Sequence, residues 1–211
     1  TIRPNAPIEF DPLDAVVRPY NQQELYNLFV RLEFVKLIDK YHLRGANIEA
    51  APVKVTTERL KHCDCMPEPG TPCAVYLAPD GSIGVAWAEG VCAVTPLEAG
   101  CLSALLASEG EFILHDCKTT WHELQTLGLP GPKAAFDTKL AAYDLNPSAS
   151  DYPVSKLATN FLGMNVDDGD PIGCAEAVWK LRAPLTAELK ELGMEQLYNE
   201  IELPLCDVLY R

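Results

Sequence analysis

One short stretch of the chain carries side chains that bind metals in many proteins. His62, Cys63, Asp64 and Cys65 are consecutive, and Cys73 lies nearby. Zinc prefers thiolates and imidazoles, so a structural zinc site is one interpretation of this cluster. The two close cysteines are separated by a single residue, which is shorter than the usual spacing, and no second pair follows. The spacing therefore favours loop cysteines without a metal.

Two further groups could act in hydrolysis. His122-Glu123 resembles the start of a zinc-protease helix, but Thr126 stands where the second histidine is needed. Cys117 lies between His115 and His122, so a thiolate nucleophile is an alternative to an inert buried thiol. Because a helical imidazole near a cysteine is common, we expect the inert thiol.

The composition restricts the class of protein. Of the 211 residues, 48% are apolar, which is enough for one substantial core. The 30 acidic and 17 basic residues give a net charge of -13, which disfavours strong binding of a phosphate backbone by this chain alone. No apolar run reaches the roughly 18 to 20 residues of a membrane span, and there is no signal-peptide pattern, so we expect a cytoplasmic protein. The eight scattered cysteines are expected to be reduced and mostly buried.

The N-terminal part is expected to be an arm followed by a helix. Four prolines within residues 1–19 indicate an extended linker. Leucines and phenylalanines at helical spacing predict a packing helix over residues 22–41, with Asn21 as its cap. A short helix is expected near Thr56 or Thr57.

The remainder alternates between strands and helices. Asp80-Gly81 provides a tight turn between the first two strands, and Thr95-Pro96-Leu97-Glu98 has the composition of a helix start. An apolar stripe of Leu97, Cys101, Leu102 and Leu105 would continue that helix. The predicted strands cover residues 74–77, 83–87, 91–94, 111–114 and 134–136. The predicted helices cover residues 118–127, 138–145, 153–162 and, with breaks at Pro184, Gly193 and Pro204, residues 174–210.

Five stretches, in the same order, resemble the 3′→5′ exonuclease region of the family A DNA polymerases, as found in bacterial DNA polymerase I. They are LFVRLEFVKLIDKY (28–41), HDCKTTWHELQTLGL (115–129), FDTKLAAYDLNPS (136–148), VSKLATNFLG (154–163) and LYNEIELPLCDVLYR (197–211). The resemblance implies an α/β fold with an RNase H-like mixed sheet flanked by helices. It divides the chain into a linker arm and connector helix (1–44), an exonuclease-like domain (45–195) and the start of a helix that leads into the polymerase domain (196–211).

The resemblance also implies where catalytic carboxylates belong. Active members hold two divalent cations with four acids, because the cations activate water and stabilise the leaving oxygen. Tyr76 and Ala78 stand in place of the acids of the first strand, Thr120 in place of the acid of the second motif, and Ser155 in place of the acid of the third. None of the four acids is present, so we expect no catalytic, metal or cofactor residues in this domain.

Three other acids are weak candidates for metal ligands. Asp116 directly precedes a helix and is expected to be its cap. Asp137 belongs to the family's motif, and its structural and functional interpretations stay open. Asp151 is expected to be a cap or turn residue.

The sequence thus predicts a catalytically inactive, structural exonuclease-like domain whose parent is a bacterial DNA-directed DNA polymerase, a nucleotidyltransferase that binds DNA in replication and repair. Its partners would be the polymerase and 5′ nuclease domains of the same polypeptide, and DNA through the parent protein. One alternative is an active exonuclease with a rearranged Mg²⁺ or Mn²⁺ site. Another is a non-cutting module for single-stranded DNA, which would use Lys118 and Lys133 with Trp121 and Trp179 as stacking platforms.

Overall fold

The computed structural model describes residues 20–32, 34, 37, 40, 41, 43, 59–60 and 66–210. Compact packing divides the chain into two units, residues 1–53 and residues 54–211. The predicted arm over 1–19, the short helix near Thr56 or Thr57 and the cluster from His62 to Cys65 lie outside the described residues. Within the described part, no helix combines the length and apolar content that a membrane span requires.

The first unit contains helix α1 (Gln22–Arg31). The side chain of Asn21 accepts a hydrogen bond from the backbone N–H of Glu24 at 3.2 Å, as a cap does. The helix predicted over residues 22–41 is only partly confirmed, because Phe34 lies outside helical structure, whereas Leu37 and Lys40 are helical. Aromatic and β-branched residues are frequent in this stretch, and they lose side-chain freedom in a helix.

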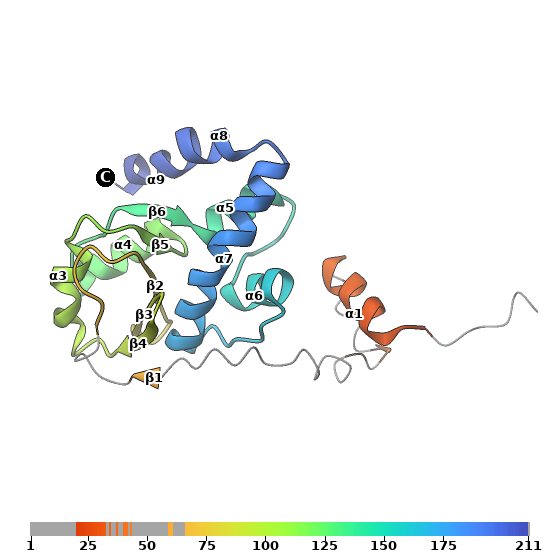
Figure 1. The fold of residues 1–211 in the computed structure, drawn as a ribbon, viewed down its shortest axis with the longest axis horizontal. Helices are drawn as coiled ribbons and strands as arrows, with labels where there is room; N and C mark the ends of the chain where they lie inside the picture. Colours follow the sequence, from red (N-terminus) through yellow and green to blue (C-terminus); the bar gives the residue numbers. More distant parts are fainter. Residues whose placement is uncertain are drawn as a thin grey trace, which may run out of the picture. The chain divides into compact units, whose positions relative to one another are not determined.

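The second unit is built on a mixed sheet of six strands (Figure 1). They are β1 (Arg59–Leu60), β2 (Cys73–Leu77), β3 (Ile83–Trp87), β4 (Gly90–Val94), β5 (Phe112–Leu114) and β6 (Ala134–Asp137). Their order is β1-β4-β3-β2-β5-β6. Strand β3 runs antiparallel to β2 and β4, whereas the other neighbouring pairs are parallel. The predicted strands and the Asp80-Gly81 turn are therefore confirmed, and β1 was not predicted.

Helices cover both faces of the sheet. The bounds after β4 are 3-10 helix η4 (Ala99–Leu102), α3 (Ser103–Leu106), α4 (Cys117–Thr126), α5 (Thr138–Leu145), α6 (Val154–Leu162), α7 (Pro171–Glu191), α8 (Glu195–Leu197), π-helix η5 (Tyr198–Glu202) and α9 (Leu203–Tyr210). Alternate residues of β2 point to opposite faces, so Ala74 and Tyr76 pack with α6 and α7. Cys73 and Val75 pack with α3 and α4. Figure 1 shows β2 to β4 between these two groups of helices.

The helix predicted after β4 begins later than expected. Thr95 Oγ1 donates to Glu98 Oε2 at 3.0 Å, but the next residues form a turn and then η4. Leu97 is 98% exposed and Cys101 is also exposed, so their place in the apolar stripe was wrong. A 3-10 helix has three residues per turn, which moves the buried face to Leu102 and, in α3, to Leu105.

The predicted breaks in the C-terminal helices are only partly confirmed. Gly193, at φ 67°, follows the end of α7, but α7 continues through Pro184. Leu181, Leu185 and Leu189 are buried along α7, and their burial outweighs the single hydrogen bond that the proline removes. Pro204 does not interrupt the helical segment either: η5 leads directly into α9, and Pro204 is the second residue of α9.

Helix α7 lies very close to the sheet at Gly84 of β3. A Cβ atom added there would overlap the carbonyl oxygen of Pro171 and lie 2.9 Å from Cβ of Ala175. We therefore expect Gly84→Ala to lower the free energy of unfolding by about 3 kcal/mol in urea denaturation. Gly100→Ala is the matched control, because nothing within 4 Å would meet the added methyl group. Equal stability of the two variants would contradict this packing.

One acid in the core generates a prediction about pH. Asp144 of α5 is 7% exposed, and its Oδ2 atom has no hydrogen-bond partner among the described residues. Burial, together with the charge of Glu202, raises the pKa of Asp144 from 3.8 to about 6. A raised pKa in the folded state stabilises the protein below pH 4, and this contribution is lost as the pH rises through 6.

Asp144→Asn is therefore expected to raise the free energy of unfolding by about 1 kcal/mol at pH 7.5, after allowance for solvent screening. The gain should shrink as the pH falls toward 4, where the aspartic acid is itself neutral. Denaturation at several pH values measures it, and the exposed Glu188→Gln serves as the control. A gain that is the same at every pH would contradict the assignment.

Candidate functional site

The structure brings two of the four positions that lack acids into one hydrogen-bonded group. Tyr76 lies on β2 and Ser155 lies in the first turn of α6. Both bond to Asp168, in the loop between α6 and α7. Ala78, just after β2, is 3% exposed and belongs to the same apolar cluster as Tyr76. Tyr76 of β2 and Ser155 of α6 therefore meet at the same residue, Asp168.

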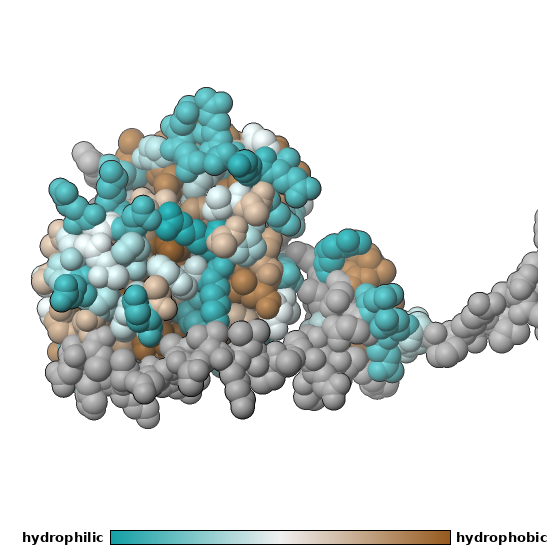
Figure 2. All heavy atoms as spheres, viewed as in Figure 1, coloured by the Kyte–Doolittle hydropathy of each residue, from teal (hydrophilic) through white to brown (hydrophobic). Residues whose placement is uncertain are grey.

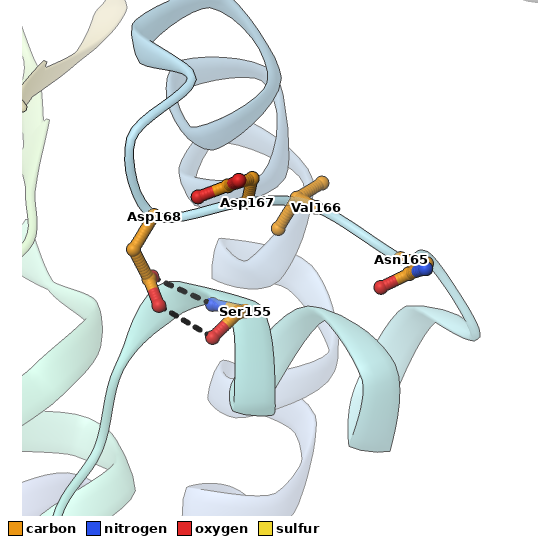
Figure 3. A pocket seen from close by; sticks show the side chains of 5 residues that line it. All are labelled: Ser155, Asn165, Val166, Asp167 and Asp168. Atoms are coloured by element: carbon orange, nitrogen blue, oxygen red, sulfur yellow. Dashed lines mark hydrogen bonds between the residues drawn. The ribbon is translucent and has the colours of Figure 1, made fainter.

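Asp168 acts on the start of α6. Its Oδ1 accepts the backbone N–H of Ser155 at 3.0 Å, and its Oδ2 accepts the Ser155 hydroxyl at 2.6 Å (Figure 3). The helix has no side-chain cap from its own N-cap residue, Pro153. A carboxylate at this place satisfies an orphan N–H and interacts favourably with the positive end of the helix. Asp168 therefore supplies the cap that Pro153 lacks.

Sequence reasoning missed Asp168. It lies 13 residues after the Ser155 that it bonds, and the acids around it have the composition of a turn. The return of the loop to the start of α6 depends on Gly163, which ends α6 at φ 64°. A local spacing rule has no signal for such a contact.

Tyr76 connects the strand to the same loop. Its hydroxyl donates to the backbone carbonyl of Asp168 at 2.9 Å. Burial raises the pKa of Tyr76, and the neighbouring Cys174 and Asp168 raise it further, so the phenol is neutral. The Tyr76 ring lies 6.3 Å from the ring of His115, between centroids. Tyr76 thus contributes a hydrogen bond where the resemblance implies a metal-binding carboxylate.

Thr120, the last of the four positions where the resemblance implies an acid, is connected to Tyr76 through His115. Thr120 is buried in α4, and its hydroxyl donates to the His115 carbonyl at 3.2 Å. Nδ1 of His115 lies 2.8 Å from Oγ1 of Thr138, which donates its own hydrogen to the Leu114 carbonyl at 3.3 Å. Burial lowers the pKa of His115, although the charge of Asp137 opposes this effect.

Asp116 is the cap of α4, as predicted. Its side chain accepts the backbone N–H of Thr119 at 3.3 Å, and it forms an ion pair with Lys139 at 2.6 Å. Burial acts to raise the pKa of Asp116, but the hydrogen bond and charge of Lys139 outweigh it, and the pKa is lowered. Asp116 has a φ of 58°, a left-handed conformation that aspartate tolerates better than most residues. These two contacts therefore hold its carboxylate in the turn between β5 and α4.

Asp137 is structural in this arrangement. Its carboxylate accepts four backbone N–H groups, from Asp116, Cys117, Lys139 and Leu140, at 2.6 to 3.1 Å. It is 2% exposed at the C-terminal end of β6. Four such bonds use most of the capacity of a carboxylate. Asp137 therefore fixes the starts of α4 and α5 rather than facing the surface as a ligand.

Asp151 is neither the cap nor a turn residue, which corrects its predicted role. The N-cap of α6 is Pro153, and Asp151 forms an ion pair with Lys156 of the first turn at 3.6 Å. Because Pro153 is the N-cap, Asp151 lies two residues too early in the sequence to accept the first N–H groups of α6.

A hollow of about 490 Å³ lies beside this group and is lined by Ser155, Asn165, Val166, Asp167 and Asp168 (Figure 3). Oδ1 of Asp167 accepts the N–H of Gly169 at 2.8 Å, and both oxygens of Asp168 bond Ser155. Across the described residues, no group of three or more His, Cys, Asp or Glu side chains gathers as a metal site. This donor set does not fit a pair of divalent cations, which require several oxygen ligands each.

Two further side chains are unsuited to the roles considered from sequence. Cys117 is 1% exposed, and burial together with the charge of Asp137 raises its pKa, which disfavours a thiolate nucleophile. Trp121 is 6% exposed and donates its indole N–H to the Pro132 carbonyl at 2.8 Å. It cannot stack on a DNA base without leaving the core, so that part of the single-strand hypothesis is wrong. Trp179 is partly buried against the core.

The comparisons with known proteins give the relationship of the chain. No protein-family model matches it. DNA polymerase I of Mycobacterium leprae (strain TN) is 26% identical over 244 aligned residues, which cover 92% of this chain and 27% of that protein. The chain is related to DNA polymerase I, a family A DNA polymerase. The chain spans about a quarter of the length of this polymerase.

A solved structure supports the relationship to DNA polymerase I. It is described as the POL domain of Pol1 from M. smegmatis in complex with DNA primer-template and dNTP. The TM-score is 0.56 with 25% sequence identity, and the match covers 66% of this chain and 27% of that chain.

The Asp168 cap can be tested by substitution. We expect Asp168→Ala to lower the free energy of unfolding by about 1 to 2 kcal/mol, because the Ser155 N–H and hydroxyl both lose their acceptor. Asp151→Ala, which breaks an exposed ion pair in the same region, should cost about 0.5 kcal/mol or less. Chemical denaturation measures both variants. An Asp168→Ala protein as stable as the Asp151→Ala control would argue against the cap.

Proposed function

We propose that this chain is the exonuclease-like domain of a DNA polymerase I, that its sheet is RNase H-like, and that it has lost 3′→5′ exonuclease activity and serves as a structural domain. The parent would be a cytoplasmic DNA-directed DNA polymerase of replication and repair, which binds DNA through its other parts. The domain would cover residues 45–195, with a connector before it and residues 196–211 leading into the polymerase domain.

The sheet supports the choice of domain. The central order β4-β3-β2-β5-β6, with β3 antiparallel to the rest, fits the three-strand meander followed by βαβα that the resemblance implies. The positions where the resemblance implies acids lie at the end of β2 and just after it, at the start of α6, and in α4 after β5. This placement agrees with a cleft at the ends of the parallel strands, where sites in α/β sheets are found.

One observation carries the proposal of inactivity: Tyr76 and Ser155 stand where the resemblance implies acids, and both oxygens of Asp168, the acid that they contact, are bonded to Ser155. Two divalent cations close together repel each other strongly unless several carboxylates surround them. A phenol and a serine hydroxyl carry no charge to offset that repulsion. The energy that would hold the metals in an active relative is missing here.

Two of the remaining acids, Asp116 and Asp137, cannot move into the site without cost. Asp116 would leave Lys139, and Asp137 would leave four backbone N–H groups buried without an acceptor. Each unsatisfied buried N–H costs about 1 to 3 kcal/mol. A rearranged active site is therefore less favourable than the inactive domain.

Loss of the acids also accounts for the way the domain is stabilised. Carboxylates that gather for metal binding repel one another when the metal is absent. In this chain the same positions carry Tyr76 and Ser155, which form hydrogen bonds with the loop before α7. The domain can therefore keep a fixed geometry without metal, as a structural role requires.

A nuclease assay tests the proposal. The purified chain is incubated with a primer labelled at its 5′ end, in Mg²⁺ or Mn²⁺, beside an active 3′→5′ exonuclease as a positive control. We expect no shortening of the primer above the level of a mock purification. Shortening that disappears in Asp116→Asn or Asp168→Asn would overturn the proposal and support the rearranged metal site, whereas shortening unchanged by both substitutions would identify a contaminant.

A further inference from the structure

Two cysteines lie together where α9 packs on α4. Cys117 is the first residue of α4, and Cys206 is the fourth residue of α9. Both are free cysteines, and Cys117 is buried whereas Cys206 is partly exposed. Cys206 packs against the apolar cluster that contains Cys117. The two residues are far apart in the sequence, so the packing of α9 on α4 is what brings their thiols together.

A ring contact shows how the two helices are aligned. The ring of Tyr210 lies 5.3 Å from the ring of Trp121, between centroids. Trp121 follows Cys117 by four residues, and Tyr210 follows Cys206 by four residues. Residues four apart lie on the same face of a helix, about one turn from each other. One turn before the ring contact, on both helices, the facing residues are therefore the two cysteines.

A hydrogen bond joins the two thiols. Burial is the main cause that raises the pKa of both, and the bond between them raises the pKa of Cys117 further but opposes the rise for Cys206. These opposite effects identify Cys117 as the donor and the Cys206 sulfur as the acceptor. The S–H of Cys206 donates to the Glu202 carbonyl at 3.6 Å, and the backbone N–H of Cys117 donates to Asp137 at 2.6 Å. The two sulfur atoms are therefore in contact and held from both sides.

Helix α9 has few other attachments to α4. None of its residues is fully buried. Figure 2 shows hydrophilic side chains at the surface over the upper part of the domain, where α8 and α9 lie in Figure 1. The Tyr210 ring also lies 4.8 Å from the ring of His122, and its hydroxyl lies 3.5 Å from Oε1 of Gln125. A short, exposed helix of this kind opens locally more often than the core does. A covalent bond to α4 would suppress that opening.

We propose that Cys117 and Cys206 form a reversible disulfide bond under oxidising conditions, and that this bond fastens α9 to α4. With a peroxide as the oxidant, the partly exposed Cys206 reacts first, and its thiol becomes a sulfenic acid while a water molecule is released. The Cys117 sulfur then attacks the Cys206 sulfur, the S–O bond breaks, and the Cys117 proton leaves with the hydroxyl as a second water. The two thiols are oxidised and the peroxide is reduced. A thiol reductant reverses the bond.

The charges around the pair set the speed of this reaction. Besides burial, the negative charges of Asp137, Glu202 and Asp116 raise the pKa of Cys206. The thiolate is the reactive form, so oxidation is slow near neutral pH. The pair therefore responds to sustained rather than brief oxidation. This inference does not rest on the proposed function, because it concerns contacts within the chain alone.

Peptide mapping of the folded 211-residue chain tests the disulfide. The chain is incubated with hydrogen peroxide at a mildly alkaline pH, which increases the thiolate fraction, and the remaining thiols are then blocked with iodoacetamide. Mass spectrometry of an unreduced digest should find the peptide of Cys117 joined to the peptide of Cys206 as the main oxidised product. Cys206→Ser should abolish this product. Cys101→Ser, which removes an exposed cysteine of η4, should leave it unchanged.

Hydrogen exchange tests whether the bond holds α9. The amides of residues 203–210 should exchange at least about 10-fold more slowly in the oxidised chain than in the reduced chain, and dithiothreitol should restore the faster exchange. Peroxide should leave this exchange unchanged in Cys206→Ser.

Several results would overturn the inference. They are Cys117 and Cys206 that remain separately blocked by iodoacetamide, Cys206 that accumulates as a sulfinic acid or joins a second chain, and a disulfide that leaves the exchange of residues 203–210 unchanged. Primer shortening by the same preparation would contradict the proposed function and leave this inference standing.

Discussion

The buried carboxylate of Asp137 is the interaction on which the arrangement of the domain depends. It accepts N–H groups from the starts of both α4 and α5, so one side chain sets the position of two helices relative to β5 and β6. Its backbone also bonds the Tyr198 hydroxyl, which attaches η5 to the same point. A carboxylate buried at 2% exposure is favourable only because these donors replace its water. The turn that contains His115 and Asp116 depends directly on the hydrogen bonds from Asp116 and Cys117 to Asp137.

This scaffold keeps its geometry although Tyr76 and Ser155 stand where the resemblance implies acids. Tyr76 and Ser155 meet at Asp168, so hydrogen bonds connect β2, α6 and the loop before α7. Hydrogen bonds of this kind act over short distances and need no ion. An active metal site would instead concentrate negative charge that destabilises the protein without metal. A hydrogen-bonded group and a metal site can be built on the same backbone. The relationship to DNA polymerase I and the proposed loss of activity are therefore compatible.

The sequence predicted the features that depend on neighbouring residues. Short apolar runs located β2 to β6, and Asn21 and Asp116 marked helix starts, because strand-forming runs and caps are local features. Contacts between distant residues were not predictable in this way. The Ser155–Asp168 pair connects a helix to a loop, and Pro184 is tolerated only because α7 packs on the sheet. Leu97 was misplaced because spacing alone does not distinguish a 3-10 turn from an α-helix.

The Tyr198 hydroxyl connects the last helical segment to β6 by a very short route. It accepts from the N–H of Asp137 and donates to the carbonyl of the same residue, 61 positions earlier in the chain. A π-helix, with its wider turn, supplies this tyrosine. A pull or rotation applied to α9 would therefore reach the end of β6 through Tyr198, and it would reach α4 through the packing of Tyr210 on Trp121 and His122.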